Sequence, residues 1–192
     1  MEQRQRLPLV LLGAAQILAW GAMFLLWVFA LPLIRGALGV DERTALRWVG
    51  MGLALLAGVA ACMNFALRRI VMRLGAWATH AALLLIAAIG FVMIGHAHQP
   101  ALLLCGYVVV GFGWASLANL PYKIILEGVE EHRIDAVLAR FNLTIVVPQI
   151  SLALSFAWLF VHIGARDALN LGAGAMAAAG LILALAALAT SA

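Results

Sequence analysis

Residues 7–34 read LPLVLLGAAQILAWGAMFLLWVFALPLI, an apolar run without a charged side chain. A helix needs roughly 20 apolar residues to cross the hydrocarbon core of a bilayer, which is about 30 Å thick. Arg4 and Arg6 precede the run, as basic residues precede a secretory signal, but the apolar part of a signal has only about 7–15 residues. We therefore expect residues 7–34 to form a transmembrane helix.

The rest of the chain repeats this pattern. Of its 192 residues, 66% are hydrophobic and 10% are charged, whereas soluble domains carry about 25% charged residues. Short segments with charges or turn residues separate the apolar runs, which are residues 7–34, 48–67, 77–95, 101–125, 136–163 and 170–189. The sequence predicts an all-α integral membrane protein in which residues 1–192 form one domain of six transmembrane helices.

The basic side chains indicate an orientation. If the N-terminus is cytoplasmic, eight of the twelve Lys and Arg residues lie at the inner side and four at the outer side. An excess of Lys and Arg is typical of cytoplasmic loops. We expect a multi-pass protein of the inner (plasma) membrane with both termini in the cytoplasm.

Several function classes are excluded by what the sequence lacks. The basic residues are spread over the connecting segments, so we expect no nucleic-acid partner. There is no phosphate-binding glycine loop, nucleophile elbow or zinc-binding helix, so we expect no enzyme and no cofactor. His96 and His98 lie in a short loop without carboxylates and are interpreted as solvated residues, not metal ligands. Cys62 and Cys105 lie in apolar runs and are interpreted as packing residues.

Polar side chains are unevenly distributed among the expected spans. Spans one, four and five carry most of them, whereas spans three and six are nearly pure Ala, Leu, Ile, Gly and Val away from their ends. Polar groups in a bilayer face protein or a water-filled cavity. We expect spans one, four and five to surround a polar cavity, with three and six outside against lipid and span two, with Asn64, intermediate.

Helical spacing places the polar and aromatic residues on common faces. Gln16, Trp20 and Trp27 share one face of span one, and Asn142 and Gln149 lie seven residues apart on span five. Indole rings beside amides suit a sugar, which offers C–H faces and hydroxyl groups. Alternatively, Trp residues form an interfacial belt and amides bridge neighbouring helices. The candidate substrate-binding residues are Gln16, Trp20, Trp27, Trp114, Asn119, Tyr122, Asn142 and Gln149.

Three prolines lie in the same three spans. Pro32, Pro121 and Pro148 are predicted to interrupt or end spans one, four and five. A proline frees a backbone carbonyl and permits bending, which transporters use near their binding sites. A simple kink that improves helix packing is the alternative interpretation.

Three stretches carry a family resemblance: GWASLANLPY at residues 113–122, RFN at 140–142 and VPQI at 147–150. They resemble the tenth and eleventh helices of sugar:cation symporters of the major facilitator superfamily, in the sucrose/proton-symporter-like branch, which is related to the glycoside-pentoside-hexuronide group. Span one is similar to the seventh helix of that family, and the segment with Arg68, Arg69 and Arg73 is similar to its basic cytoplasmic loop. The resemblance covers nearly the whole chain but only the C-terminal half of a twelve-helix fold, built as a 3+3 inverted repeat.

Two basic residues depart from the family pattern. Lys123 stands where a small residue follows Pro-Tyr, and Arg140 stands where an apolar residue precedes Phe-Asn. We interpret both as side chains that snorkel to the inner interface, with a substrate-binding or coupling role as the alternative.

The resemblance implies a transporter whose ion-coupling residues lie mainly in a second set of helices. No Asp or Glu lies inside an expected span, whereas proton coupling generally needs an intramembrane carboxylate. In the resembling symporters the other six helices mainly supply it. We therefore expect half of a secondary active transporter that takes up a sugar, polyol or glycoside together with a proton or sodium ion, and that needs a second six-helix half. A homodimeric small transporter and a truncated or non-transporting membrane subunit are the alternatives.

Overall fold

The computed structural model describes residues 2–191, and it describes the side chains of all of these except residues 2–6, 128, 156, 190 and 191. Six described helices are long and apolar enough to cross a membrane. The elements are α1 (Glu2–Leu38), α2 (Glu42–Leu74), α3 (Ala76–Gly95), α4 (Pro100–Gly128), the 3₁₀ turn η1 (Glu131–Arg133), α5 (Ile134–Leu154), the short α6 (Phe156–His162) and α7 (Ala165–Ser191). The predicted all-α membrane fold of six spans is confirmed.

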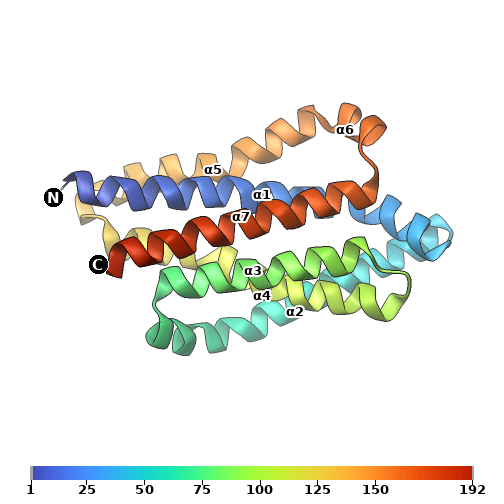
Figure 1. Ribbon diagram of the computed structural model, residues 1–192, viewed down its shortest axis with the longest axis horizontal. Coiled ribbons are helices and arrows are strands. Elements are labelled where there is room, and N and C mark those ends of the chain that lie inside the picture. Colours follow the sequence, from blue (N-terminus) through green and yellow to red (C-terminus); the bar gives the residue numbers. More distant parts are fainter. Residues whose placement is uncertain (1, 192) are drawn as a thin grey trace.

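The long helices run antiparallel in one bundle. Both chain ends lie at the same end of the bundle, together with the α2–α3 turn and the α4–α5 connection (Figure 1). The α1–α2, α3–α4 and α6–α7 connections lie at the opposite end. The prediction that both termini lie on one side of the membrane therefore agrees with the fold, and the assignment of that side to the cytoplasm stays a prediction.

The six helices form two triplets with matching contacts. In the first triplet α3 packs on α4 and α2 packs on α4, and in the second α7 packs on α1 and α5 packs on α1. The two outer partners, α3 and α7, also pack against each other. In these contacts α4, α3 and α2 of the first triplet correspond to α1, α7 and α5 of the second. Along the chain, α1, α2 and α3 are therefore repeated as α4, α5 and α7, and because three helices cross the bundle three times, α4 begins at the end opposite to α1, which makes an inverted repeat (Figure 1).

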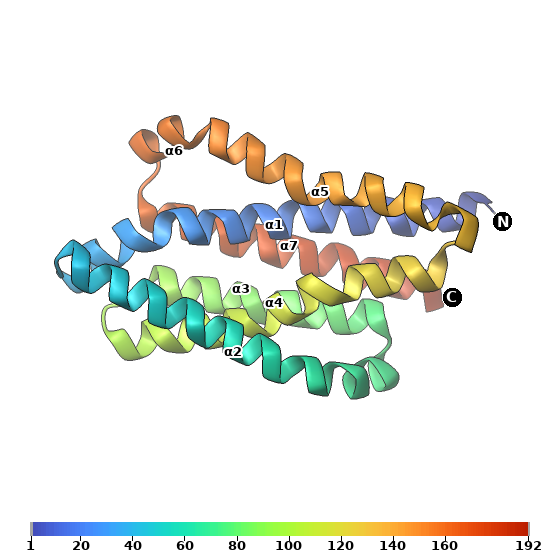
Figure 2. The same ribbon diagram turned by 180° about the vertical axis from the view of Figure 1, so that it is seen from behind.

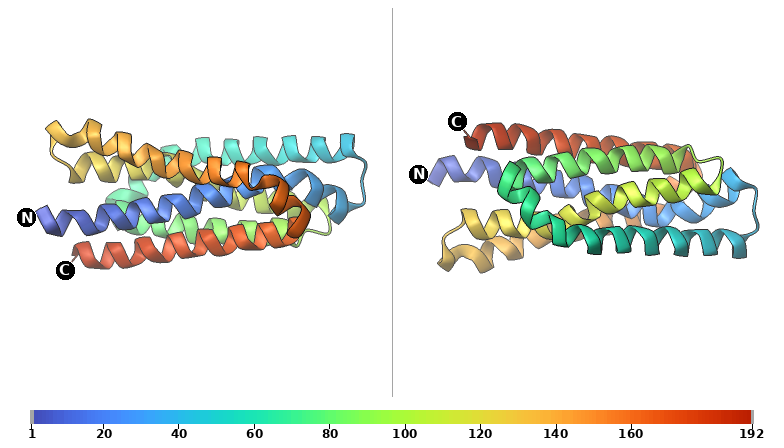
Figure 3. Two further views of the ribbon diagram at one scale, coloured as in Figure 1. Left: turned by 90° about the horizontal axis from the view of Figure 1, so that it is seen from above. Right: turned by 90° about the horizontal axis from the view of Figure 1, so that it is seen from below.

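This symmetry divides the bundle into two sides. The views from above and below show α3 and α7 on one side, α2 and α5 on the opposite side, and α1 and α4 between them (Figure 3). We call α3 and α7, with the faces of α1 and α4 that they cover, the packed layer. The exposed faces of α2, α4 and α5 form the open side.

Small residues hold the packed layer together. A Cβ added at Gly90 of α3 would lie 2.8 Å from the carbonyl oxygen of Gly106 and 2.8 Å from the amide nitrogen of Val110, both on α4. These are backbone atoms, so they cannot move aside as a flexible side chain can. Membrane helices lack a hydrophobic drive to associate and depend on such close approach.

The second helix extends beyond its predicted ends. The predicted span 48–67 is longer at both ends in α2. At its start, Asp41 caps the helix by accepting a hydrogen bond from the Thr44 amide at 2.9 Å. Arg68, Arg69 and Arg73 therefore lie in the last turns of a helix and not in a loop, and the chain turns only at Gly75, which has φ of 79°. A helix that leaves the bilayer can continue in water when its end carries charge, which the apolar run alone does not reveal.

The predicted fifth span, residues 136–163, is bent. It divides at Ser155 into α5 and α6, although helical hydrogen bonds continue from the Ser155 amide to Ser151 and from the Leu159 amide to Ser155. The bend is visible from behind (Figure 2). α6 lies apart from the main bundle in this view, and Phe160 of α6 stacks on Phe29 of α1 with ring centroids 6.1 Å apart.

The prolines do not end their helices. α1 continues past Pro32 to Leu38, and Pro121 and Pro148 lie inside α4 and α5. The prediction that they interrupt or end the spans is therefore wrong for the helix boundaries, because a proline ring removes one helical hydrogen bond while the neighbouring turns keep theirs. Each proline still leaves the carbonyl four residues earlier without its usual amide donor.

Candidate functional site

Three tryptophans from α1 and α4 meet at the centre of the bundle. The ring centroids of Trp20 and Trp114 are 5.3 Å apart, those of Trp27 and Trp114 are 5.8 Å apart, and those of Trp20 and Trp27 are 6.4 Å apart. All three pairs are edge-to-face, the favoured geometry for aromatic rings. Trp27 is 38% exposed, so one indole of this tryptophan cluster faces out of the chain. The structure therefore brings together three candidates that lie up to 94 residues apart in sequence.

Behind the cluster, a chain of buried polar groups joins α1, α3 and α4. The Gln16 amide nitrogen lies 3.4 Å from Nε2 of His80, and Nδ1 of His80 lies 3.0 Å from Oγ of Ser116. The Ser116 hydroxyl donates its proton to the Gly113 carbonyl at 2.9 Å, so Oγ is left to accept from Nδ1–H. Neutral His80 then accepts from Gln16 at Nε2, which assigns a donor and an acceptor to every contact.

Gln16 differs from its predicted role. It is 1% exposed and lies inside the bundle, not on a surface that a solute could reach. Its Oε1 has no hydrogen-bond partner among the described residues. His80 was missed by the sequence reasoning, because a single histidine one turn into a short apolar span looks like a residue at the span end. Its recognisable signal is the absence of any charged neighbour that would keep it in water.

On the open side, amides and a phenol pair across helices. The Asn119 amide donates to Oδ1 of Asn64 on α2 at 3.1 Å and to the Ala115 carbonyl at 2.7 Å. Tyr122 donates to Oδ1 of Asn142 on α5 at 3.2 Å. Both asparagine pairs are exposed, so these groups link α2, α4 and α5 while remaining accessible on the open side.

The remaining candidates have more local partners. Gln149 donates to the Ile145 carbonyl of its own helix at 3.1 Å and contacts no other candidate through a hydrogen bond that the structure describes. Lys123 pairs with Glu127 one turn further along α4. This pairing agrees with the interface interpretation of Lys123.

The exposed residues of α4 show which way the site faces. Ala118, Asn119 and Lys123 are exposed, and Trp114 and Tyr122 are half-buried. Residues at these spacings cover one side of a helix, with Trp114 at the edge nearest α1 and Lys123 at the other. The polar and aromatic candidates of α4 therefore point out of the chain, toward the open side.

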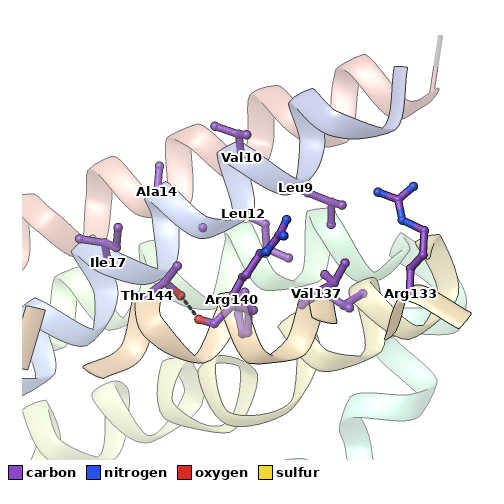
Figure 4. A pocket seen from close by; sticks show the side chains of 12 residues that line it. Leu9, Val10, Leu12, Ala14, Ile17, Arg133, Val137, Arg140 and Thr144 are labelled. Carbon is purple, nitrogen blue, oxygen red and sulfur yellow. Dashed lines mark hydrogen bonds between the residues drawn. The ribbon is translucent and has the colours of Figure 1, made fainter. Parts of the chain in front are cut away.

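A separate cavity of about 670 Å³ lies between α1 and α5 near the chain ends. Its walls are mostly apolar, and its charged members are Arg133 and Arg140 (Figure 4). None of the predicted substrate-binding residues lines it. Among the described residues there is no group of three or more His, Cys, Asp or Glu that could hold a metal ion.

These features define a six-helix membrane domain built as a 3+3 inverted repeat. A solved structure of similar fold is the POT family transporter PepTSo, which matches with a TM-score of 0.75 and 17% sequence identity. The match covers 93% of this chain and 37% of that one, so the chain spans somewhat over a third of that transporter's length. No protein-family model and no curated protein sequence matches the chain. The likeness shows that the six helices of this chain are arranged as in part of that transporter.

Proposed function

We propose that the chain supplies six helices of a secondary active transporter. In this proposal the open side faces a second set of six helices, and solute binds between the two sets and is exposed to each side of the membrane in turn. The observation that carries the proposal is the outward-facing group of indoles, amides and phenol on α1, α2, α4 and α5. Polar groups exposed at membrane depth are costly unless they face protein or water.

The chemistry of this face favours a sugar or a related polyol or glycoside. Trp27 and Trp114 offer flat apolar surfaces, and Asn119 and Asn142 offer donors and acceptors beside them. Such a face stacks on the C–H surface of a sugar ring and hydrogen-bonds its hydroxyl groups. A proton or sodium ion would drive uptake, with its site mainly in the second set of helices, because the carboxylates of this chain lie near helix ends or in connections.

The direct test is uptake of radiolabelled sucrose and methyl glucoside by cells that express the chain together with its neighbouring coding sequence. Asn119→Ala should lower uptake about 5- to 150-fold, since a polar group left without its partner in a closed binding site costs about 1–3 kcal/mol. Trp114→Ala should lower uptake as well, because it removes an aromatic surface on which a sugar ring would stack. Asn170→Ala is the matched control, because it removes an exposed amide from α7 in the packed layer.

Two outcomes would redirect the proposal. Unchanged uptake in Asn119→Ala and Trp114→Ala, with normal protein levels, would indicate a non-transporting subunit. Full uptake by vesicles that contain this chain alone would show that a second copy of the same chain, and not a different set of helices, completes the transporter.

A further inference from the structure

The α1–α5 cavity has the walls of a hydrocarbon site. Leu9, Leu12 and Ile17 of α1 face Val137 and Phe141 of α5 across it. Its volume of about 670 Å³ lies within the range of about 300–1,000 Å³ typical of ligand sites. Water has no favourable place against such walls, so in a bilayer an apolar group fills this space.

One end of the cavity is positively charged. Arg133 and Arg140 both line it, and their side chains point toward α1 (Figure 4). Arg140 lies six residues after the start of α5, which places its Cα about 9 Å along the helix. A guanidinium at that depth needs an anion or reaches back to the headgroups.

The cavity wall offers Arg140 no carboxylate. Its described lining residues include no Asp or Glu. Glu130 and Asp135 lie nearby in sequence but are exposed, and Glu130 pairs with His132 at 3.8 Å. Thr144 donates its hydroxyl to the Phe141 carbonyl at 2.6 Å, so the guanidinium of Arg140 is the main group of the wall that can recognise an anion.

We propose that this cavity binds an anionic phospholipid, with its phosphate at Arg140, on the side toward Arg133, and an acyl chain along the apolar wall of α1. A free phosphate ion would leave the apolar walls empty, whereas a phospholipid matches both parts of the site. Basic pockets between membrane helices at the cytoplasmic side are suited to such headgroups. The cavity lies at the end that holds both termini, so the lipid belongs to the leaflet that the basic residues assign to the cytoplasm. The site does not depend on the proposed transport function.

Native mass spectrometry of the purified chain in neutral detergent tests this site. The probes are phosphatidylglycerol and phosphatidylcholine with identical acyl chains. We expect the chain to bind phosphatidylglycerol in preference, and Arg140→Gln to weaken that binding about tenfold, since it removes charge-assisted hydrogen bonds. Arg140→Lys should keep part of it. The matched control is Arg69→Gln, which removes an exposed arginine at the same end of the bundle but outside the cavity.

A second variant tests the apolar wall separately. Gly13 lines the cavity, and Gly13→Leu should exclude the acyl chain while both arginines remain. Loss of phosphatidylglycerol binding in Gly13→Leu and Arg140→Gln, but not in Arg69→Gln, supports the proposal. Equal binding of the two lipids, equal loss in Arg140→Gln and Arg69→Gln, or complete displacement of the lipid by inorganic phosphate at constant ionic strength would overturn it.

Discussion

The packed layer and the open side use polar atoms in opposite ways. In α3, 61% of the most apolar stretch is buried inside the bundle, compared with 17% in α2 and 11% in α5. The packed layer contains the buried polar chain through His80, and its helices otherwise associate through close backbone contact. The open side keeps its polar groups exposed and paired across helices.

The difference shows how to recognise a functional face in a bilayer. Exposed apolar residues such as Phe65 of α2 and Leu185 of α7 are equally stable against lipid or against another helix. Apolar exposure therefore does not distinguish lipid from a partner. Exposed amides indicate a protein partner or water and not lipid, because lipid tails cannot form hydrogen bonds with them. The open side is thus the face on which changes should affect function more than stability.

The largest effect on stability is expected at the helix contact of the packed layer. Gly90→Ala places a methyl group 2.8 Å from two backbone atoms of α4, and such overpacking destabilises by about 1–3 kcal/mol. Thermal unfolding in detergent measures this loss of stability.

Gly58→Ala is the control for that substitution. A Cβ at Gly58 of α2 meets nothing within 4 Å, so this variant should match the wild type. If both variants unfold at the wild-type temperature, α3 and α4 are not as closely packed as the structure shows.

A smaller loss is expected at the buried polar chain. His80→Leu removes the partner of Gln16 and should destabilise by about 0.6 kcal/mol, the average for hydrogen bonds between membrane helices, and by at most about 1.7 kcal/mol. The double variant Gln16→Leu/His80→Leu should lose less than the sum of the two single variants, because the orphaned amide is then absent. Strict additivity of the three unfolding free energies would show that the two side chains do not interact.

On the open side we expect substitutions to reduce solute uptake and to leave stability nearly unchanged. Asn119→Ala removes an exposed hydrogen bond to Asn64, so its unfolding free energy should stay within about 0.5 kcal/mol of wild type. Solute uptake should nevertheless fall. A variant that unfolds readily and transports normally would place Asn119 among the packing residues instead.

The smallest expected effect is the dependence of stability on low pH, and it arises from Asp41, which lies outside the spans. The Thr44 amide, and then its hydroxyl, donate to Asp41 and hold the pKa of that carboxyl below its usual value. A lowered folded-state pKa contributes stability above the ordinary carboxyl pKa, and that contribution is lost as pH falls through the folded-state value. Asp41→Asn keeps a good helix cap without a titrating group. Melting temperature between pH 6 and pH 2 should therefore fall slightly more in the wild type, and parallel curves would contradict this role.

The sequence was sufficient for the number and type of helices, because composition and run length decide them. It did not reveal that α2 continues through Arg68 and Arg69, or that residues 136–163 bend at Ser155. Both depend on what surrounds a helix and not on its own residues.

Among the site candidates, spacing along one helix grouped Trp20 with Trp27, but the approach of Trp114 needed the tertiary fold. The pairing of Gln16 with His80 was not predictable either, since it joins helices 64 residues apart.

Water accessibility of the open side is the most direct test of its function. Ala118 of α4 and Ala82 of α3 are both exposed, the first on the open side and the second on the packed layer. In a background with Cys62→Ala and Cys105→Ala, each is replaced by cysteine and treated in native membranes with a membrane-impermeant thiol reagent. We expect labelling of Ala118→Cys and protection of Ala82→Cys, because in the proposed function only the open side borders a water-filled path. Protection of both positions, or faster labelling of Ala82→Cys, would contradict a solute path along this face.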